Sequence, residues 1–182
     1  MKSHKNAGSC VLLALCLVFT PTVGVGQDVP AHVDEGTDKM NDSADTIFAL
    51  KAAQDTTAEM QFGHLAVNKG SDPTVKAFGE RLVGDQTAPN EQLQKIAKQQ
   101  NMTLPTAMNA KDQAEYDKLK DLSGPQFDQA YVKAIVKDCE GAVKEFEKEA
   151  RKGRNQEWKN FASLTLPVLQ SHLNDAKSLN HS

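Results

Sequence analysis

Apolar side chains recur at helical spacing in four long segments, and this pattern restricts the fold more than any other feature. In residues 123–154 they are Val132, Ile135, Ala142 and Phe146, which share one helix face. We find no run of alternating β-branched residues bounded by turns, as a strand would require. Hydrophobic residues make up 39% of the chain and aromatic residues 5%, which suits helices packed through small aliphatic side chains. The sequence therefore predicts an all-α fold.

Capping residues and breakers set the ends of the predicted helices. They bound helices at 42–70, 71–101, 123–153 and from 155 onward, with a short helix at 109–122 in the connector. Pro73 suits a first helical turn, and Ser123 has capping-box spacing to Gln126. Pro89 cannot donate to the carbonyl of Asp85, so we expect a kink or an early stop there.

Loop lengths predict the topology. Only a few residues join the first helix to the second and the third to the fourth, so each pair must form an antiparallel hairpin. A helix of 28 residues is about 42 Å long, and the connector spans roughly 50 Å. The connector can therefore cross the bundle. This predicts a ferritin-like four-helix bundle, with a plain up-down bundle as the alternative.

Residues 1–26 have the layout of a secretory signal peptide. Lys2 and Lys5 give a positive start, residues 10–19 are apolar, and Gly24-Val25-Gly26 is a small-x-small cleavage pattern. The apolar run is about half of the ~20 residues that a spanning helix needs. We therefore expect an exported, periplasmic protein. A retained segment that anchors the chain to the inner membrane is the alternative.

The rest of the chain divides into two parts. Residues 27–41 are polar and are broken by Pro30 and Gly36, which indicates a flexible linker. Residues 42–181 carry the apolar stripes and form the predicted bundle domain. Loss of residues 1–26, which hold two lysines and no acid, changes the formal net charge from −3 to −5. No basic block remains, so nucleic acid is not an expected partner. A protein partner is not identified, and a dimer stays open.

One polar residue interrupts each apolar stripe near its middle. The four are Glu59, Gln86, Cys139 and His172. At 1.5 Å per residue they would share a layer less than ~8 Å thick. Carboxylate, thiolate and imidazole are zinc ligands, so Glu59, Cys139 and His172 are candidate metal ligands, with Gln86 in the same layer. A structural polar layer and a redox-active thiol at Cys139 are the alternatives.

Several motifs group together in a way that resembles a known family. They include Phe127-Asp128-x-x-Tyr131, Leu166-Pro167-x-Leu-x-x-His172-Leu and Phe48-Ala-Leu-Lys-Ala-Ala. Over residues 45–180 the chain is similar to a bacterial family of exported, ferritin-like proteins of unknown function, often labelled as membrane proteins. Members usually carry Asp-His on the second helix and a histidine at the matching place on the third. This chain has Asp85-Gln86 and Asp138-Cys139 there, and only Glu59 and His172 match.

The motifs for common reactions are absent from the sequence. There is no glycine-rich phosphate loop, nucleophile elbow, Cys-x-x-Cys pair or Glu-x-x-His di-iron signature. We therefore expect an exported bundle protein without catalysis, in an envelope or stress-related role. The alternative is a metal-binding or redox-responsive bundle that uses Glu59, Cys139 and His172.

Overall fold

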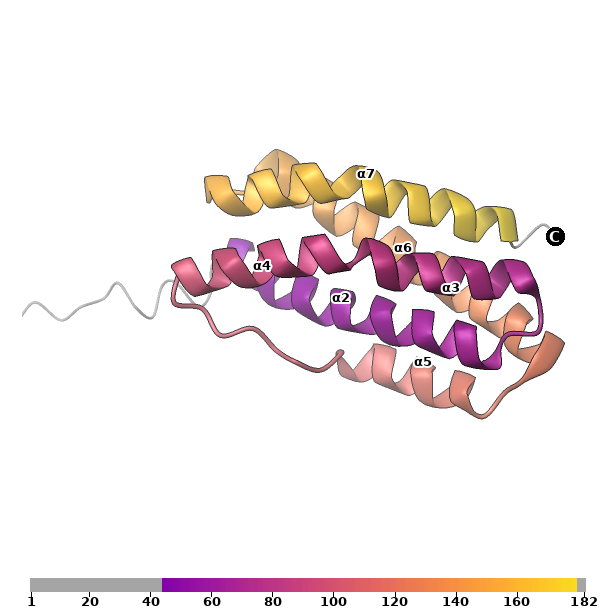
Figure 1. The fold of residues 1–182 in the computed structure, drawn as a ribbon. Helices are drawn as coiled ribbons and strands as arrows, with labels where there is room; N and C mark the ends of the chain where they lie inside the picture. Colours follow the sequence, from indigo (N-terminus) through magenta and orange to yellow (C-terminus); the bar gives the residue numbers. More distant parts are fainter. Residues whose placement is uncertain (1–43, 180–182) are drawn as a thin grey trace, which may run out of the picture. The chain divides into compact units, whose positions relative to one another are not determined.

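The structure, a computed structural model, describes residues 44–179, which form helices joined by loops (Figure 1). The helices are α2 Ala44–Lys69, α3 Pro73–Asp85, α4 Thr87–Gln99, α5 Ala110–Lys120, α6 Gly124–Lys152 and α7 Gln156–Leu179. No strand occurs in this part of the chain, which confirms the all-α prediction. The expected signal peptide, the linker and the first helix cap lie outside the described residues.

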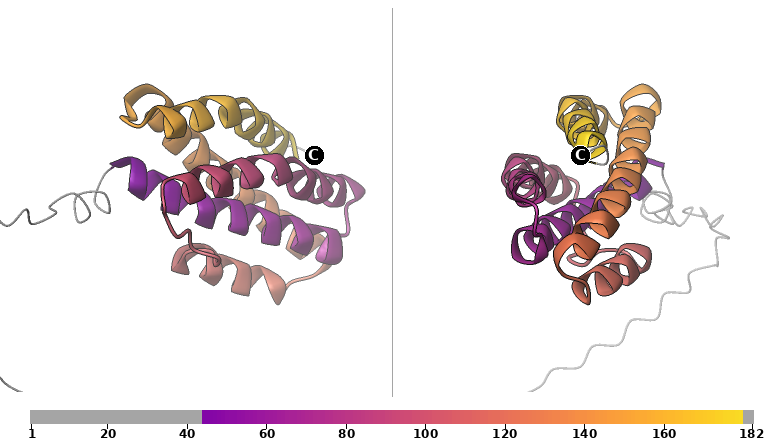
Figure 2. Two further views of the ribbon diagram at one scale, coloured as in Figure 1. Left: turned by 60° about the vertical axis from the view of Figure 1, so that its left-hand side comes forward. Right: turned by 90° about the vertical axis from the view of Figure 1, so that its right-hand side faces the viewer.

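Four rods of helix surround one interior, and α5 lies outside them. Viewed from the end in Figure 2, α2, the α3–α4 rod, α7 and α6 form a ring in that order. The chain runs back along α2 through α3 and α4, and back along α6 through α7 (Figure 1). Helix α5 packs against α2 and α6. Since short turns join each neighbouring pair, the loop lengths predicted these two pairings.

Local caps explain where three of the helices begin. The Asp72 side chain accepts a hydrogen bond from the Thr74 amide at 2.8 Å, and Pro73 follows it in the first turn of α3. Asn109 caps α5, and Asn155 accepts from the Glu157 amide at 2.9 Å. Ser123 occupies the cap position of α6 but its side chain makes no capping hydrogen bond, so the capping-box expectation is wrong. Gly124, with a φ of 61°, begins this helix.

The predicted second helix is two helices, α3 and α4, separated at Gln86. Because Pro89 has no amide proton, the Asp85 carbonyl lacks its helical donor. The rod is therefore interrupted one turn before the proline, as the sequence suggested. Helix α7 instead continues through Pro167. The interruption places Gln86 between two helix ends, where the residue is only 3% exposed.

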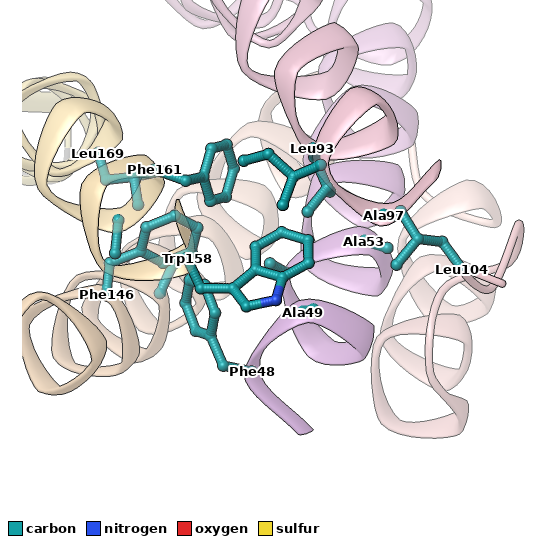
Figure 3. Packing of buried hydrophobic residues seen from close by; sticks show 14 of the residues in the cluster. Phe48, Ala49, Ala53, Leu93, Ala97, Leu104, Phe146, Trp158, Phe161 and Leu169 are labelled. Carbon is teal, nitrogen blue, oxygen red and sulfur yellow. The ribbon is translucent and has the colours of Figure 1, made fainter. Parts of the chain in front are cut away.

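The apolar interior has two clusters, one in each half of the bundle. The first gathers around Trp158, Phe161 and Phe146, and α4 contributes Leu93 to it (Figure 3). Phe48 and Phe146 meet edge to face with ring centroids 4.9 Å apart. The second cluster gathers around Phe127, Tyr131 and Leu82. Helices α2, α6 and α7 contribute to both clusters, so the same three helices connect the two halves.

Candidate functional site

A buried polar layer lies where the two apolar clusters meet. It contains Glu59, Gln86 and His172, whose residues are 1%, 3% and 0% exposed. Along α2 the first cluster ends at Ala53 and the second begins at Ala58, so Glu59 stands at the boundary. Each of these side chains comes from the middle of its predicted stripe. The interior is therefore apolar at both ends and polar near mid-height.

Glu59 is in contact with both of its neighbours in the layer. The Gln86 side-chain amide Nε2 donates a hydrogen bond to Glu59 Oε2. His172 Nδ1 lies 3.7 Å from the same oxygen, and this nitrogen has no hydrogen-bond partner. The geometry joins α2, the α3–α4 junction and α7 through one carboxylate. A buried carboxylate without such partners would be strongly destabilising.

The other imidazole nitrogen of His172, Nε2, contacts side chains that lie toward the surface. His172 Nε2 lies 3.0 Å from Asp85 Oδ2, and Asp85 also accepts from Arg81 Nε at 3.1 Å. Arg81 further pairs with Asp175 and donates to Ser171 Oγ at 2.9 Å. A chain of polar contacts thus runs from buried Glu59 to exposed Arg81. The sequence analysis missed Arg81, although its i,i+4 spacing to Asp85 was a visible signal.

Electrostatics favour a charged imidazole in this arrangement. Burial alone would lower the pKa of His172, but Glu59 and Asp85 outweigh it, and the pKa is raised. Burial would likewise raise the pKa of Asp85, yet the contacts with His172 and Arg81 lower it. The layer can therefore hold a proton on His172 between two carboxyl groups.

Cys139 is buried next to this layer, in the second apolar cluster, with 1% of its surface exposed. Burial, followed by the nearby Glu59 and Asp138 carboxylates, raises the pKa of its thiol. The thiolate is the nucleophilic and metal-binding form, so these surroundings oppose both roles. The structure thus brings Glu59, Gln86 and His172 into contact and leaves Cys139 outside these contacts.

The layer leaves little room for a ligand. A cavity of about 10 Å³ borders Glu59, Gln86 and Thr165, about the smallest space in which one water fits. Within residues 44–179, no three His, Cys, Asp or Glu side chains are grouped so that they could hold a metal ion. The layer thus consists of an amide and an imidazole that both approach the carboxylate of Glu59.

A second group of acids lies between α2, α5 and α6, and the sequence analysis did not single it out. Asp55 and Asp112 are 7% and 4% exposed. Lys51 donates to Asp55 at 2.7 Å, and Asn109 donates to Asp112 at 2.5 Å. Asp138 faces the same region, and its Oδ2 atom is buried without a hydrogen-bond partner.

Two solved structures are similar to this bundle. One is the "putative secreted protein DUF305" from Streptomyces coelicolor, with 17% identity, a TM-score of 0.63, and coverage of 76% of this chain and 91% of that chain. The other is a DUF305 fragment from Deinococcus radiodurans, with 11% identity, a TM-score of 0.67, and coverage of 76% and 95% respectively. At such low identity the likeness concerns the fold alone.

Comparison with protein families identifies the chain more closely. No curated protein sequence shows significant similarity to it. A family model described as "Domain of unknown function (DUF4142)" matches residues 30–179. This match agrees with the expected bacterial family of unknown function and covers nearly all of the predicted bundle domain. The chain therefore belongs to the DUF4142 family.

Proposed function

We propose that the chain is an exported, non-catalytic bundle protein whose buried polar layer specifies how the helices pack. The observation that carries this proposal is that the polar layer is filled by its own side chains. Glu59, Gln86 and His172 engage one another, and only about 10 Å³ is free beside them. A substrate site needs a far larger pocket with free polar groups. The protein then acts through its surface, in an envelope or stress-related role.

Export is the second part of the proposal. Its support is the signal-like layout of residues 1–26 and the likeness to a DUF305 protein named as secreted. No helix within residues 44–179 is long and apolar enough to cross a bilayer. Cell fractionation with N-terminal sequencing tests this part. A periplasmic protein beginning near Gln27 supports it, and a membrane-bound protein that retains residues 1–26 overturns it.

The ferritin-like arrangement is also part of the proposal. It is supported by the antiparallel pairing of α2 with the α3–α4 rod and of α6 with α7 (Figure 2). The connector that contains α5 joins the two pairs, as in ferritin-like bundles with one long crossover. Two features differ from a simple four-helix bundle, namely the break at Gln86 and the additional helix α5.

The alternative proposal is a metal or redox site at Glu59, Cys139 and His172. It draws support from His172 Nδ1, which is buried without a hydrogen-bond partner and faces Glu59. Elemental analysis of protein purified without a tag distinguishes the two proposals. A metal-free protein whose thiol reacts with a disulfide reagent only after unfolding supports the closed layer. A stoichiometric metal that is lost in Cys139→Ser supports the alternative.

A further inference from the structure

An aspartate from α6 holds the turn between α2 and α3. The Asp128 carboxylate accepts hydrogen bonds from the backbone amides of Ser71 at 3.0 Å and Asp72 at 2.9 Å. Just before this turn, the Gly70 amide donates to the Ala66 carbonyl at 2.9 Å. We call this arrangement the first turn contact. It fastens the first hairpin to the helix that begins the second.

The turn between α6 and α7, at the other end of the bundle, is held in the same way by α2 (Figure 1). The Asp45 carboxylate accepts hydrogen bonds from the amides of Arg154 at 3.0 Å and Asn155 at 2.7 Å. The Gly153 amide donates to the Glu149 carbonyl at 2.8 Å. Each residue of this second turn contact is separated from its counterpart in the first by the same number of positions. The two hairpins therefore repeat one unit, and their contacts are reciprocal, as across a two-fold axis.

The apolar interior follows the same repeat. Phe48 and Phe161 belong to the first cluster. Their counterparts at the same interval are Tyr131 and Phe78, which belong to the second cluster. The two halves of the bundle can therefore be compared position by position.

The two turn contacts differ in one buried acid. Glu149, at the second, is 5% exposed, whereas its counterpart at the first is Ala66. Glu149 Oε1 is buried without a hydrogen-bond partner, and a Cβ atom at Gly153 would lie 2.9 Å from Glu149 Cδ. The carboxyl group thus lies directly against the turn. At the first contact, Asp72 is exposed and its hydrogen bonds with Thr74 lower its pKa, so it stays charged above pH 5.

The surroundings of Glu149 oppose its ionisation. Burial has the largest effect, followed by the Asp45 carboxylate from α2. On its own helix, Lys148 favours the charge and Glu145 disfavours it, and the pKa of Glu149 is raised from 4.5 to about 7. The two turn amides are already bound by Asp45, so they do not compensate a second carboxylate.

We propose that the second turn contact is a proton-controlled switch. While Glu149 is neutral, the α6–α7 turn stays closed on the start of α2. When Glu149 loses its proton to solvent, two buried carboxylates face each other with too few donors. The turn then moves away from α2, which lets water reach the charge. The first turn contact, with an alanine at the equivalent position, stays closed.

Amide hydrogen exchange of the full chain at pH 5 and pH 8 tests the switch, with protection factors that correct for the intrinsic pH dependence of exchange. The Arg154 and Asn155 amides should lose protection roughly fivefold to tenfold at pH 8, because the ionisation of Glu149 is linked to opening. The Ser71 and Asp72 amides should keep their protection, so the first turn is an internal control. An equal loss at both turns overturns the proposal.

Two variants assign the effect to Glu149. Glu149→Gln keeps the shape of the side chain without an ionisable group, so the α6–α7 amides should be equally protected at both pH values. Glu147→Gln removes another acid from the same helix and should behave like the wild type. A pH-dependent loss that persists in Glu149→Gln overturns the proposal.

A carbon-13 NMR titration of the Glu149 carboxyl group gives a check that needs no variant. A midpoint that coincides with the loss of protection at the α6–α7 turn supports the switch. A midpoint near the ordinary value of 4.5 overturns it.

Discussion

Gln86 has a role that its place in an apolar stripe did not reveal. It ends α3, precedes α4 and directs its amide to the buried carboxylate of Glu59. The break in the rod lets a side chain enter the layer from between two helix ends. Its position thus depends on Pro89, one turn further along the chain. The interruption of the backbone therefore allows the side-chain amide of Gln86 to reach the buried polar layer.

Removal of the Gln86 side-chain amide should destabilise the protein. We expect Gln86→Ala to lower the free energy of unfolding by about 2–3 kcal/mol, because it leaves the buried Glu59 carboxylate without its donor. Urea denaturation followed by circular dichroism measures the change. Gln92→Ala, an exposed glutamine on α4, is the control and should change stability by less than ~0.5 kcal/mol. Equal effects in the two variants would contradict this role.

His172 and Asp85 should make stability depend on pH. The pKa of His172 is raised in the fold, so its protonated form stabilises the bundle below the ordinary value of 6.5, and this contribution is lost as pH rises through the raised pKa. We expect Asp85→Asn to lower the His172 pKa in an NMR titration. It should also destabilise the protein by about 1 kcal/mol at pH 5.5, a modest figure because Asp85 is 38% exposed.

The difference between wild type and Asp85→Asn should shrink once pH exceeds the raised pKa of His172. Asp175→Asn removes a partner of Arg81 but leaves the imidazole contact in place, so it is the matched control. An imidazole that titrates identically in the wild type and Asp85→Asn would show that Asp85 does not hold the proton.

Between elements, α2 and α3 approach each other closely at Gly63 and Gly79. A Cβ atom at Gly79 would lie 2.6 Å from the Gly63 carbonyl oxygen and 2.8 Å from Ala66 Cβ. A Cβ atom at Gly63 would similarly lie 2.7 Å from the Gly79 carbonyl oxygen. The two backbones therefore touch, and this contact sets the separation and the axial register of the first helix pair.

We expect Gly79→Ala to destabilise the protein by about 1–3 kcal/mol, because backbone atoms on both helices must move apart. Gly84→Ala is the control on the same helix, since nothing lies within 4 Å of its added Cβ. That control should stabilise the protein by roughly 0.5–1 kcal/mol through helix propensity. Thermal unfolding compares the two. A neutral Gly79→Ala would mean that the helices are not held at this distance.

Another contact between elements joins the start of α2 to the α6–α7 turn. The Asp45 carboxylate accepts hydrogen bonds from the backbone amides of Arg154 at 3.0 Å and Asn155 at 2.7 Å. Burial, together with the neighbouring Asp45, raises the pKa of Glu149 from 4.5 to about 7. Two acids thus share one helix junction, and the raised pKa of Glu149 favours its protonated form.

This junction makes stability depend on pH in a second way, which arises from a carboxyl group rather than from an imidazole. A raised carboxyl pKa means that the folded state binds the proton more tightly, so this contribution to stability is present below pH 4.5 and is lost as pH rises toward about 7. We expect Glu149→Gln to remove this slope and to stabilise the protein at pH 8 by ~1 kcal/mol. Denaturation at pH 5 and pH 8 measures both the pH dependence of stability and the stabilisation at pH 8. Glu147→Gln, on the same helix, should retain the slope.

For the molecule as a whole, the two apolar clusters are the main source of stability, and three helices cross from one to the other. Trp158 stands at the centre of the first cluster, 1% exposed, among Leu93, Ala49 and Phe161 (Figure 3). Its indole Nε1 donates to Gln100 Oε1 at 2.9 Å, which ties α7 to the end of α4. We infer that the two halves unfold together.

Truncation of Trp158 tests this cooperativity. We expect Trp158→Ala to cost about 3–5 kcal/mol, as for other large buried aromatic residues. Near-ultraviolet and far-ultraviolet circular dichroism should still give coincident transitions. Leu164→Ala, at a side chain that is 68% exposed, is the control and should leave the midpoint unchanged. Separate transitions for the two signals would show that the halves are independent.

The sequence by itself determined the helices, most of their ends, the break near Pro89 and the burial of Glu59, Gln86, Cys139 and His172. These features follow from periodicity, caps and backbone chemistry, which act over a few residues. Only the tertiary structure decided that His172 Nε2 lies against Asp85, that Cys139 lies outside the contacts of the polar layer, and that α5 leaves a pocket against α6. Such contacts depend on the rotation and axial register of whole helices, which interhelical approaches such as Gly63 against Gly79 set and which a single stripe does not encode.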